Sequence, residues 1–437
     1  MADERLLKNF MASKSNQKIN SDKNLNNKNL SNKNLSNKNL SNKNLKSFRI
    51  LSKTDELFSC SRCGTCLAFC PVYKNTLDES FAPRGKLSLI EAAANKKIPL
   101  TEKLSNKIYT CTLCNYCTKE CPSGLKINEL FKAVREDLVE EKTYPEILNI
   151  LKQKIKQAYN VTFDSNEGRL DWLRQVPNTN VEDYLKDTAE VVYFTGCVSS
   201  FSPRSFSIPR AIVNILKEAN VDFTLLGEDE WCCGFPLLSS GMTEEVKFLA
   251  KHNLEMIEKK GAKILVASCP SCFHTFKHEY EQIIGKKLNF EIMHISQYLL
   301  MLVKEGKIKL NNLNVSVTYH DPCDLGRNSG IYDELRQLIK SIPGINLIEM
   351  SSSMQQSNCC GGGGNLESIN PLLSAKIAEC RADEIIKTGA EIAVSACQQC
   401  ERTLSTAVKM KKAAANHKVK VMDISELILE SIKKISV

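Results

Sequence analysis

Residues 191–197 read VVYFTGC, and residues 315–323 read VSVTYHDPC. Both are runs of β-branched and aromatic residues, typical of a buried strand, and both end in a cysteine. Each run is followed by a Cys-Cys-Gly triplet and then by an apolar run that leads into a C-x2-C pair (KILVASCPSC, 263–272, and AEIAVSACQQC, 390–400). Equivalent cysteines lie 126, 127 or 128 residues apart. Spacing held this closely indicates an internal duplication rather than chance clustering.

The stretches between these cysteines alternate between helical and extended patterns. Helical patterns cover 208–219 and 244–260 in the first copy, and 333–341 and a stretch ending at Lys387 in the second copy. Strands that alternate with helices predict βαβ units and a mostly parallel sheet. We therefore expect an α/β fold with two similar lobes, over residues 190–310 and 311–437.

Four of the repeated cysteines follow directly on predicted strands: Cys197, Cys269, Cys323 and Cys397. In open α/β sheets, ligands bind in the crevice outside the carboxyl ends of the strands. The glycine of each Cys-Cys-Gly turn permits close backbone approach and unusual φ values. Each lobe therefore gathers five thiols at one edge, which is more than a cubane cluster needs. An unusual, non-cubane cluster or a site with a spare ligand is implied.

A second cysteine pattern precedes the lobes. The sequence C-x2-C-x2-C-x3-C-P occurs at residues 60–71 and again at 111–122. In two-cluster ferredoxins with this pattern, the fourth cysteine of each motif ligates the other cluster. We therefore expect a small helical domain over 49–142 with two cubane [4Fe–4S] clusters. The first would be held by Cys60, Cys63, Cys66 and Cys121, and the second by Cys111, Cys114, Cys117 and Cys70. Structural zinc is the alternative, but it gives no reason for a triplet followed by Cys-Pro.

The rest of the chain sets broad limits on function. Residues 21–45 repeat a five-residue Asn/Lys-rich unit, which predicts a disordered tail over 1–48. Residues 1–50 carry a net charge of +8, out of +9 for the whole chain, so the basic excess lies in the tail and no nucleic-acid surface is expected. We expect a helical linker over 143–189, anchored by Trp172 and Tyr184. Without a long apolar run or a secretory signal, we expect a cytoplasmic protein whose 19 cysteines bind metal rather than form disulfides.

The motifs TGC, WCCG, SCPSC, HDPC and CCGGGG resemble those of the iron–sulfur catalytic subunit of heterodisulfide reductase, over about residues 55–430. The order of a ferredoxin module followed by two CCG repeats is similar to the fused form found in methanogenesis. The resemblance implies a non-cubane [4Fe–4S] cluster in each lobe. One would be held by Cys197, Cys232, Cys233, Cys269 and Cys272, and the other by Cys323, Cys359, Cys360, Cys397 and Cys400. It also implies that the coenzyme M–coenzyme B heterodisulfide enters between the lobes and is reduced with electrons relayed through the cubane clusters.

The resemblance extends to the iron–sulfur subunits of glycolate and lactate oxidases. The alternative function is therefore electron relay for a flavin-dependent 2-hydroxyacid dehydrogenase. The complete C-x2-C pair in both lobes favours the reductase. The implied partner is a membrane cytochrome b-type subunit, or a flavoprotein or hydrogenase electron donor, so the chain could also lie at a membrane through that partner. A redox-sensing regulatory protein ranks below both of these functions.

A few residues outside the cluster motifs carry separate expectations. Arg84 and Lys86 either hydrogen-bond to cluster sulfurs or belong to a helix that starts after Pro83. His320 either donates to a cluster sulfur, protonates a departing thiol or makes a structural hydrogen bond. Cys380 has no place in the repeat, and we expect it to be a small buried residue, with a redox switch as the alternative. For Lys277, His278 and Arg327 we expect solvated helix faces rather than binding of a substrate anion.

Overall fold

The computed structural model describes residues 49–174, 176, 179–412 and 419–433. The predicted tail over 1–48 lies outside the described residues. Within them no helix is both long enough and apolar enough to cross a membrane. One compact unit begins at Ser47 and contains the ferredoxin-type motifs and the repeated cysteines.

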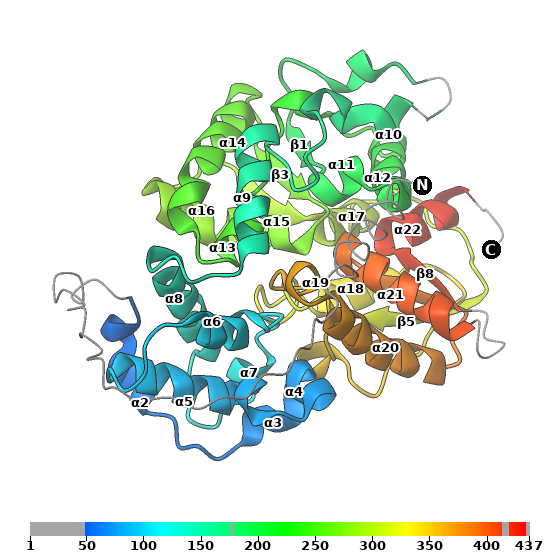
Figure 1. Cartoon of the computed structure of the whole chain (residues 1–437). Coiled ribbons are helices and arrows are strands. Elements are labelled where there is room, and N and C mark those ends of the chain that lie inside the picture. The colour runs from blue at the N-terminus through cyan, green and yellow to red at the C-terminus, as the bar shows by residue number, and fades with distance from the viewer. Residues whose placement is uncertain (1–48, 175, 177–178, 413–418, 434–437) are drawn as a thin grey trace, which may run out of the picture. The chain divides into compact units, whose positions relative to one another are not determined.

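The first part of this unit is helical and carries both ferredoxin-type motifs (Figure 1, blue and cyan). Most of its helices are short because the cysteine loops interrupt them. Pro71 and Pro83 each occupy the first position of a helix, where the backbone N–H that proline lacks would have no partner within the helix. Its helices are α2 (Thr54–Phe58), α3 (Thr65–Phe69), α4 (Pro71–Thr76), α5 (Pro83–Ala94), α6 (Glu102–Tyr109), α7 (Tyr116–Lys119) and α8 (Ile127–Glu140).

Two further helices lead into the lobes, α9 (Glu146–Ala158) and α10 (Asp171–Arg174). Trp172 is fully buried and Tyr184 nearly so, which confirms both as packing anchors.

The first lobe is a four-stranded parallel sheet with strand order β2-β1-β3-β4. All four residues of β1 and three of β3 are buried, as expected for a sheet covered on both faces. Its strands are β1 (Val191–Phe194), β2 (Phe223–Thr224), β3 (Ile264–Ala267) and β4 (Glu291–His294). Its helices are α11 (Cys197–Phe201), α12 (Ser207–Glu218), α13 (Phe235–Leu238), α14 (Lys247–Lys259), α15 (Pro270–His274), α16 (Tyr280–Ile284) and α17 (Ile295–Lys304).

The second lobe repeats this topology with strand order β6-β5-β7-β8, again all parallel. Its strands are β5 (Val315–His320), β6 (Ile345–Leu347), β7 (Ile392–Ser395) and β8 (Lys420–Asp423). Its helices are α18 (Asp333–Lys340), α19 (Leu366–Ile369), α20 (Pro371–Lys387), α21 (Gln398–Lys412) and α22 (Ile424–Lys433). The α/β fold class and the duplication are confirmed.

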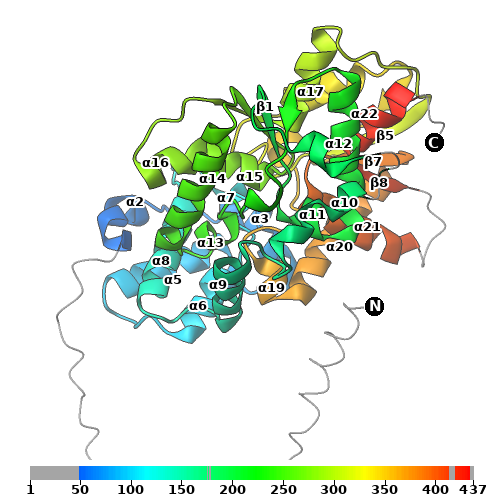
Figure 2. The same cartoon turned by 90° about the horizontal axis from the view of Figure 1, so that it is seen from above.

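The two lobes pack through equivalent helices. Helix α12 of the first lobe contacts α22 of the second (Figure 2). Helix α17 of the first lobe contacts α18 of the second. In the duplication α12 corresponds to α18, and α17 corresponds to α22. The interface is therefore built twice from the same pair of elements, and one apolar core runs through it.

Candidate metal centres

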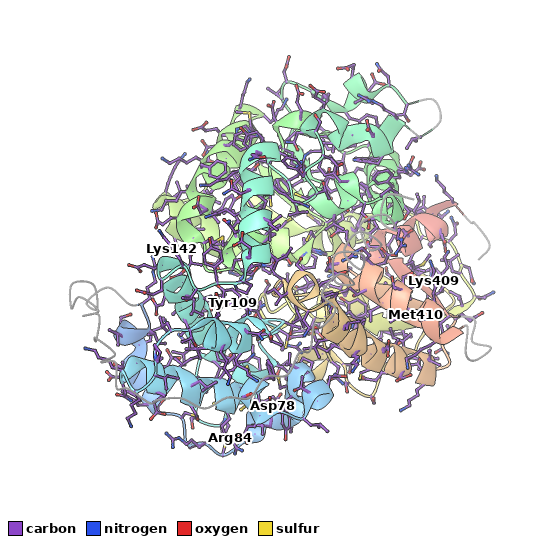
Figure 3. All side chains as sticks on the ribbon, in the orientation of Figure 1. Asp78, Arg84, Tyr109, Lys142, Lys409 and Met410 are labelled. Atoms are coloured by element: carbon purple, nitrogen blue, oxygen red, sulfur yellow. The ribbon has the colours of Figure 1, made fainter. Side chains whose placement is uncertain are left out.

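The first four predicted ligands line one cavity. Cys60, Cys63, Cys66 and Cys121 surround it together with Arg84, whose position is labelled in Figure 3. Cys63 is exposed, and hydrogen bonds from Thr65 lower the pKa of its thiol. This set, called set 1 below, therefore lies at the surface of the protein.

The other four ferredoxin-type cysteines form set 2, which is more buried: Cys70, Cys111, Cys114 and Cys117. Cys70 caps the start of α4, where its sulfur accepts the Tyr73 N–H at 3.5 Å. Burial raises the pKa of the Cys70 thiol to about 12, and the neighbouring Cys111 and Cys114 contribute to the same shift. The structure thus brings Cys70 to the cysteines of the second motif, as the ferredoxin pattern predicts.

The five repeated cysteines of the first lobe are joined by thiol hydrogen bonds. Cys232 and Cys272 both donate to Cys233, and these bonds lower the pKa of the Cys233 thiol. Cys197 donates to Cys232, and Cys272 also contacts Cys269. Gly196, at φ +79°, leaves room for this group, since an added Cβ would lie 3.4 Å from the Cys272 sulfur.

The five cysteines of the second lobe are joined in the same way: Cys323, Cys359, Cys360, Cys397 and Cys400. Here the group includes an outside member, because Cys114 of set 2 is hydrogen-bonded to Cys359 and this bond raises the pKa of the Cys114 thiol. Set 2 and the second-lobe cysteines also share one buried apolar cluster. The ferredoxin-type part therefore meets the second lobe through its metal-binding residues.

The structure confirms that the strand ends deliver these cysteines. Cys197 and Cys323 follow β1 and β5 by three residues, and Cys269 and Cys397 follow β3 and β7 by two. Ser268 and Gln398, the residues beside Cys269 and Cys397, are hydrogen-bonded across the lobe boundary. Both lobes therefore present their cysteine groups toward one another.

Polar side chains close the boundary around these groups. Ser271 donates to the Asp324 carboxylate at 2.6 Å, and Gln398 donates to Ser268 at 2.7 Å. Beside them a cavity opens where the helical part and both lobes meet, lined among others by Lys132. Asp324, which directly follows Cys323, lies in the wall of this cavity.

Each lobe surrounds its cysteines with a different polar group. In the first lobe the buried Glu230 accepts the N–H groups of Thr195 and Gly196 at 2.7 and 2.8 Å, and pairs with Arg169 at 2.7 Å. The guanidinium of Arg169 lies 4.0 Å from the Cys197 sulfur. Burial raises the pKa of the Glu230 carboxyl, although Arg169 opposes that shift.

In the second lobe the polar group beside the cysteines is a histidine at the end of β5. His320 takes the place of Phe194, and one of its ring nitrogens and the sulfurs of Cys360 and Cys400 all lie within 4.8 Å of one another. Arg381 donates to its Nδ1 at 3.0 Å, so the proton of the neutral ring lies on Nε2. Burial and the Arg381 charge hold the pKa of His320 well below its usual range. Of the roles expected for His320, the structural hydrogen bond is therefore present, to Arg381. Its Nε2–H remains able to donate a second hydrogen bond.

The run of four glycines allows the second lobe to reach set 2. An added Cβ at Gly364 would lie 2.3 Å from the carbonyl oxygen of Cys111, and one at Gly363 would lie 2.6 Å from that of Thr112. Gly241 of the first lobe lies equally close to α8, with a Cβ position 2.4 Å from the Arg135 backbone. Glycine is needed here for close approach of backbones rather than for a nucleotide phosphate.

Two expectations are wrong. Cys380 is exposed rather than buried, and its thiol donates to Asn75 at 3.6 Å. Arg327 does not lie on a solvated face: it is 4% exposed and donates to the carbonyl oxygen of Cys114 at 2.7 Å. Lys277 and His278 are exposed, as expected. These differences arise because packing between distant segments covers Arg327 and leaves Cys380 bare.

Arg84 and Lys86 lie in the helix that begins at Pro83, and neither side chain is bonded to a cysteine sulfur in the part of the chain that the structure describes. Arg84 pairs with Glu79 at 2.6 Å, and Lys86 donates to the carbonyl of Thr110 at 2.6 Å. Arg135, which the sequence-based prediction missed, is fully buried beside them. A signal was available, because Arg135 falls on the apolar face of α8 with Phe131 and Leu138.

All four groups offer only soft sulfur ligands in short loops, which is the donor set of iron–sulfur clusters or zinc. Comparison with known proteins decides the class. Residues 56–125 match the family model of the 4Fe-4S dicluster domain, and residues 191–277 and 317–405 match that of the cysteine-rich (CCG) domain. The chain is thus an iron–sulfur protein with a two-cluster module and a duplicated cysteine-rich module.

The relatives narrow this class. The chain is 34% identical to a subunit of the dihydromethanophenazine:CoB--CoM heterodisulfide reductase of Methanosarcina mazei, over 86% of this chain and 94% of that protein. It is 29% identical to the EtfAB:quinone oxidoreductase of Syntrophomonas wolfei, over 86% of this chain and 58% of that protein. Among solved structures, a hypothetical protein from Helicobacter pylori has a similar fold, with a TM-score of 0.51 and 9% identity, covering 87% of this chain and 72% of the other.

The chain belongs to the family of this heterodisulfide reductase subunit, and it is an iron–sulfur oxidoreductase subunit of that family.

Proposed function

We propose that this chain reduces the heterodisulfide of coenzyme M and coenzyme B between its two lobes. The observation that carries the proposal is the pair of complete five-cysteine groups whose neighbouring residues are bonded across the lobe boundary, Ser271 to Asp324 at 2.6 Å and Gln398 to Ser268 at 2.7 Å. The reductase subunits to which the chain is similar over most of its length support the choice of substrate.

The ligand sets follow from the groups described above. We propose that sets 1 and 2 each hold a cubane [4Fe–4S] cluster, and that the five cysteines of each lobe hold a non-cubane [4Fe–4S] cluster. When bound, such clusters accept and release electrons one at a time. Reducing a disulfide takes two electrons, so two cluster sites at one bond match the need of the reaction.

The protein side chains position the reacting groups and move protons. The strand ends fix the cysteines, and the Ser271–Asp324 and Gln398–Ser268 bonds keep the lobes together around them. His320 carries its proton on Nε2 and has one ring nitrogen within 4.8 Å of the Cys360 and Cys400 sulfurs, and we propose that Nε2 donates to one of these sulfurs. The cavity at Lys132 is the entrance that we propose for the substrate.

A second function is favoured by one of the relatives. Similarity to an EtfAB:quinone oxidoreductase supports a relay role, in which the chain transfers electrons for a flavoprotein without acting on a disulfide. The dehydrogenase of a 2-hydroxyacid is one such flavoprotein. In both cases we propose a partner subunit: a membrane cytochrome b-type subunit, or a flavoprotein or hydrogenase donor.

The test is turnover of the protein purified without oxygen, with a reduced viologen as electron donor. The proposal predicts that the coenzyme M–coenzyme B heterodisulfide oxidises the viologen, and that the two homodisulfides do so far more slowly. Cys233→Ala should abolish turnover and leave the cubane EPR signals, whereas Cys380→Ala, outside all four groups, should leave turnover unchanged. Intact clusters without heterodisulfide turnover would contradict the proposal and favour the relay role.

A further inference from the structure

Six arginine or lysine side chains are buried in the described part of the chain, and they fall into two classes. Three have carboxylate partners: Arg169 with Glu230 at 2.7 Å, Arg336 with Asp321 at 2.8 Å, and Arg381 with Glu384 at 2.6 Å. The other three form no ion pair among the described residues: Lys86, Arg135 and Arg327. A buried charge without a partner is expensive, so these three require an explanation.

All three unpaired cations surround set 2. Lys86 donates to the carbonyl oxygen of Thr110 at 2.6 Å, Arg135 to that of Cys111 at 3.2 Å, and Arg327 to that of Cys114 at 2.7 Å. Thr110 directly precedes Cys111, so all three cations hydrogen-bond to the backbone of the loop that carries the set 2 thiols.

The remaining contacts of these cations are neutral. Arg135 also donates to the carbonyls of Ser239 and Gly364 at 2.5 and 3.3 Å, and its Nε has no acceptor among the described residues. Arg327 also donates to the carbonyls of Gln355 and Ser357. Each cation lies over an aromatic ring, at 4.7 to 5.5 Å from the ring centre. Carbonyl dipoles and ring faces reduce the cost of burial but supply no negative charge.

The carboxylate that follows Arg135 on α8 does not pair with it. Asp137 follows Arg135 by two residues on α8 and is buried, but it accepts the N–H groups of Arg49 and Ile50 at 2.7 and 3.1 Å. The group that set 2 holds would supply negative charge to all three cations, and Arg327 also lies near Cys323 and Cys359 of the second lobe. Four thiolates around an oxidised [4Fe–4S] core carry a net charge of about −2, and one added electron makes it about −3.

The cations around set 1 differ from those around set 2 in both pairing and burial. Its arginines are paired, Arg84 with Glu79 at 2.6 Å and Arg62 with Glu91 at 2.8 Å, and both lie toward solvent. Paired charges near water change a neighbouring site little, because water screens them and the carboxylate cancels them.

We propose that Lys86, Arg135 and Arg327 raise the reduction potential of the cluster in set 2 above that of the cluster in set 1. The inference rests on the proposed assignment of [4Fe–4S] clusters to these sets. A buried positive charge stabilises the reduced state, with its extra electron, more than the oxidised state. The three cations thus stabilise the reduced state of the cluster in set 2, the set that contacts the second lobe.

The experiment is an anaerobic EPR-monitored redox titration of the full chain, with a chemical reductant supplying one electron to each cluster. Cys117→Ser identifies the signal of set 2 by its loss. Arg327→Gln should lower the equilibrium constant for reduction of the set 2 cluster at least tenfold, which lowers its reduction potential by 59 mV for a one-electron couple. The reduction potential of the set 1 cluster should not change. Arg327→Lys should restore most of the shift, and the matched control Arg84→Gln should leave set 2 unchanged.

Equal potentials of set 2 in Arg327→Gln and the unmodified chain, with both signals present, would overturn the proposal. So would an equal shift of both clusters. If Arg327→Gln loses the set 2 signal, Lys86→Gln decides by the same criterion, because Lys86 contacts a different carbonyl. Absence of both cubane signals from the unmodified chain would instead contradict the cluster assignment itself.

Discussion

The two lobes share a topology and a cysteine pattern, yet only the second meets the ferredoxin-type part through its cysteines in the described part of the chain. Cys359 is hydrogen-bonded to Cys114 of set 2, whereas the equivalent Cys232 is hydrogen-bonded within its own lobe. The lobes also differ beside the cysteines, with Glu230 and Arg169 in the first and His320 and Arg381 in the second. Two lobes of one topology therefore have unequal contacts around their cysteines. Under the proposed function, the second lobe receives the electrons and the first lobe completes the substrate site.

The contact at the glycine run should give the largest effect. Gly364→Ala places a Cβ 2.3 Å from the backbone oxygen of Cys111 at φ +59°, so the second lobe must move away from set 2. We expect a loss of about 3 kcal/mol in the free energy of unfolding, from overpacking and from the unfavourable φ together. Anaerobic urea denaturation measures it.

Gly389→Ala is the matched control for that change. Gly389 has a similar φ of +69°, but an added Cβ would meet nothing within 4 Å. Its cost should be about 1 kcal/mol, which is the conformational cost alone. Equal costs for the two variants would show that the close approach at Gly364 is unimportant.

The buried ion pair of the first lobe should give the next largest effect. Glu230→Gln leaves Arg169 buried without a carboxylate, and we expect a loss of about 3 kcal/mol or less. Glu190→Gln, which breaks the exposed pair with Lys263, should cost no more than about 0.5 kcal/mol. Thermal unfolding of both variants without oxygen compares them. If Glu230→Gln unfolds at the same temperature as the unmodified chain, the buried Arg169 does not depend on the Glu230 carboxylate.

The smallest effect concerns equivalent strand ends. His294 ends β4 and Asp423 ends β8, and both side chains are fully buried. Burial lowers the pKa of His294 to about 3 and raises that of Asp423 to about 7. In the folded state Asp423 keeps its proton to a higher pH than in the unfolded chain, so its contribution to stability falls between about pH 4 and 7.

His294 has the opposite sign. Its folded-state pKa is depressed, so its contribution is lost as the pH falls from about 6.5 toward 3. Asp423→Asn should therefore remove the fall in stability between about pH 4 and 7, so that below about pH 6.5 the opposite slope due to His294 remains alone. Unfolding free energies measured from about pH 4 to 8 test this, and the same pH dependence in the variant and the unmodified chain would contradict it.

Much of the site could be predicted from the sequence because it depends on local spacing. The C-x2-C loops and strand ends place Cys60 with Cys63, and Cys269 with Cys272, whatever the rest of the chain does. The contacts between parts could not be predicted in this way. Arg327 is a polar residue that the sequence places on a solvated face, and only the packing of the second lobe on α7 buries it. The glycine run and the Cys114–Cys359 contact likewise depend on how two separately encoded modules meet.

The most direct test of this electron path is EPR of the reduced set 2 cluster in two matched variants, Cys359→Ser and Cys232→Ser. Each removes one equivalent cysteine from one lobe. Because Cys359 contacts Cys114 and Cys232 does not, we predict that Cys359→Ser changes the spin relaxation and line shape of the set 2 signal. Cys232→Ser should leave that signal as it is in the unmodified chain. Equal changes in both variants, or a change in Cys232→Ser alone, would contradict the claim that set 2 leads to the second lobe.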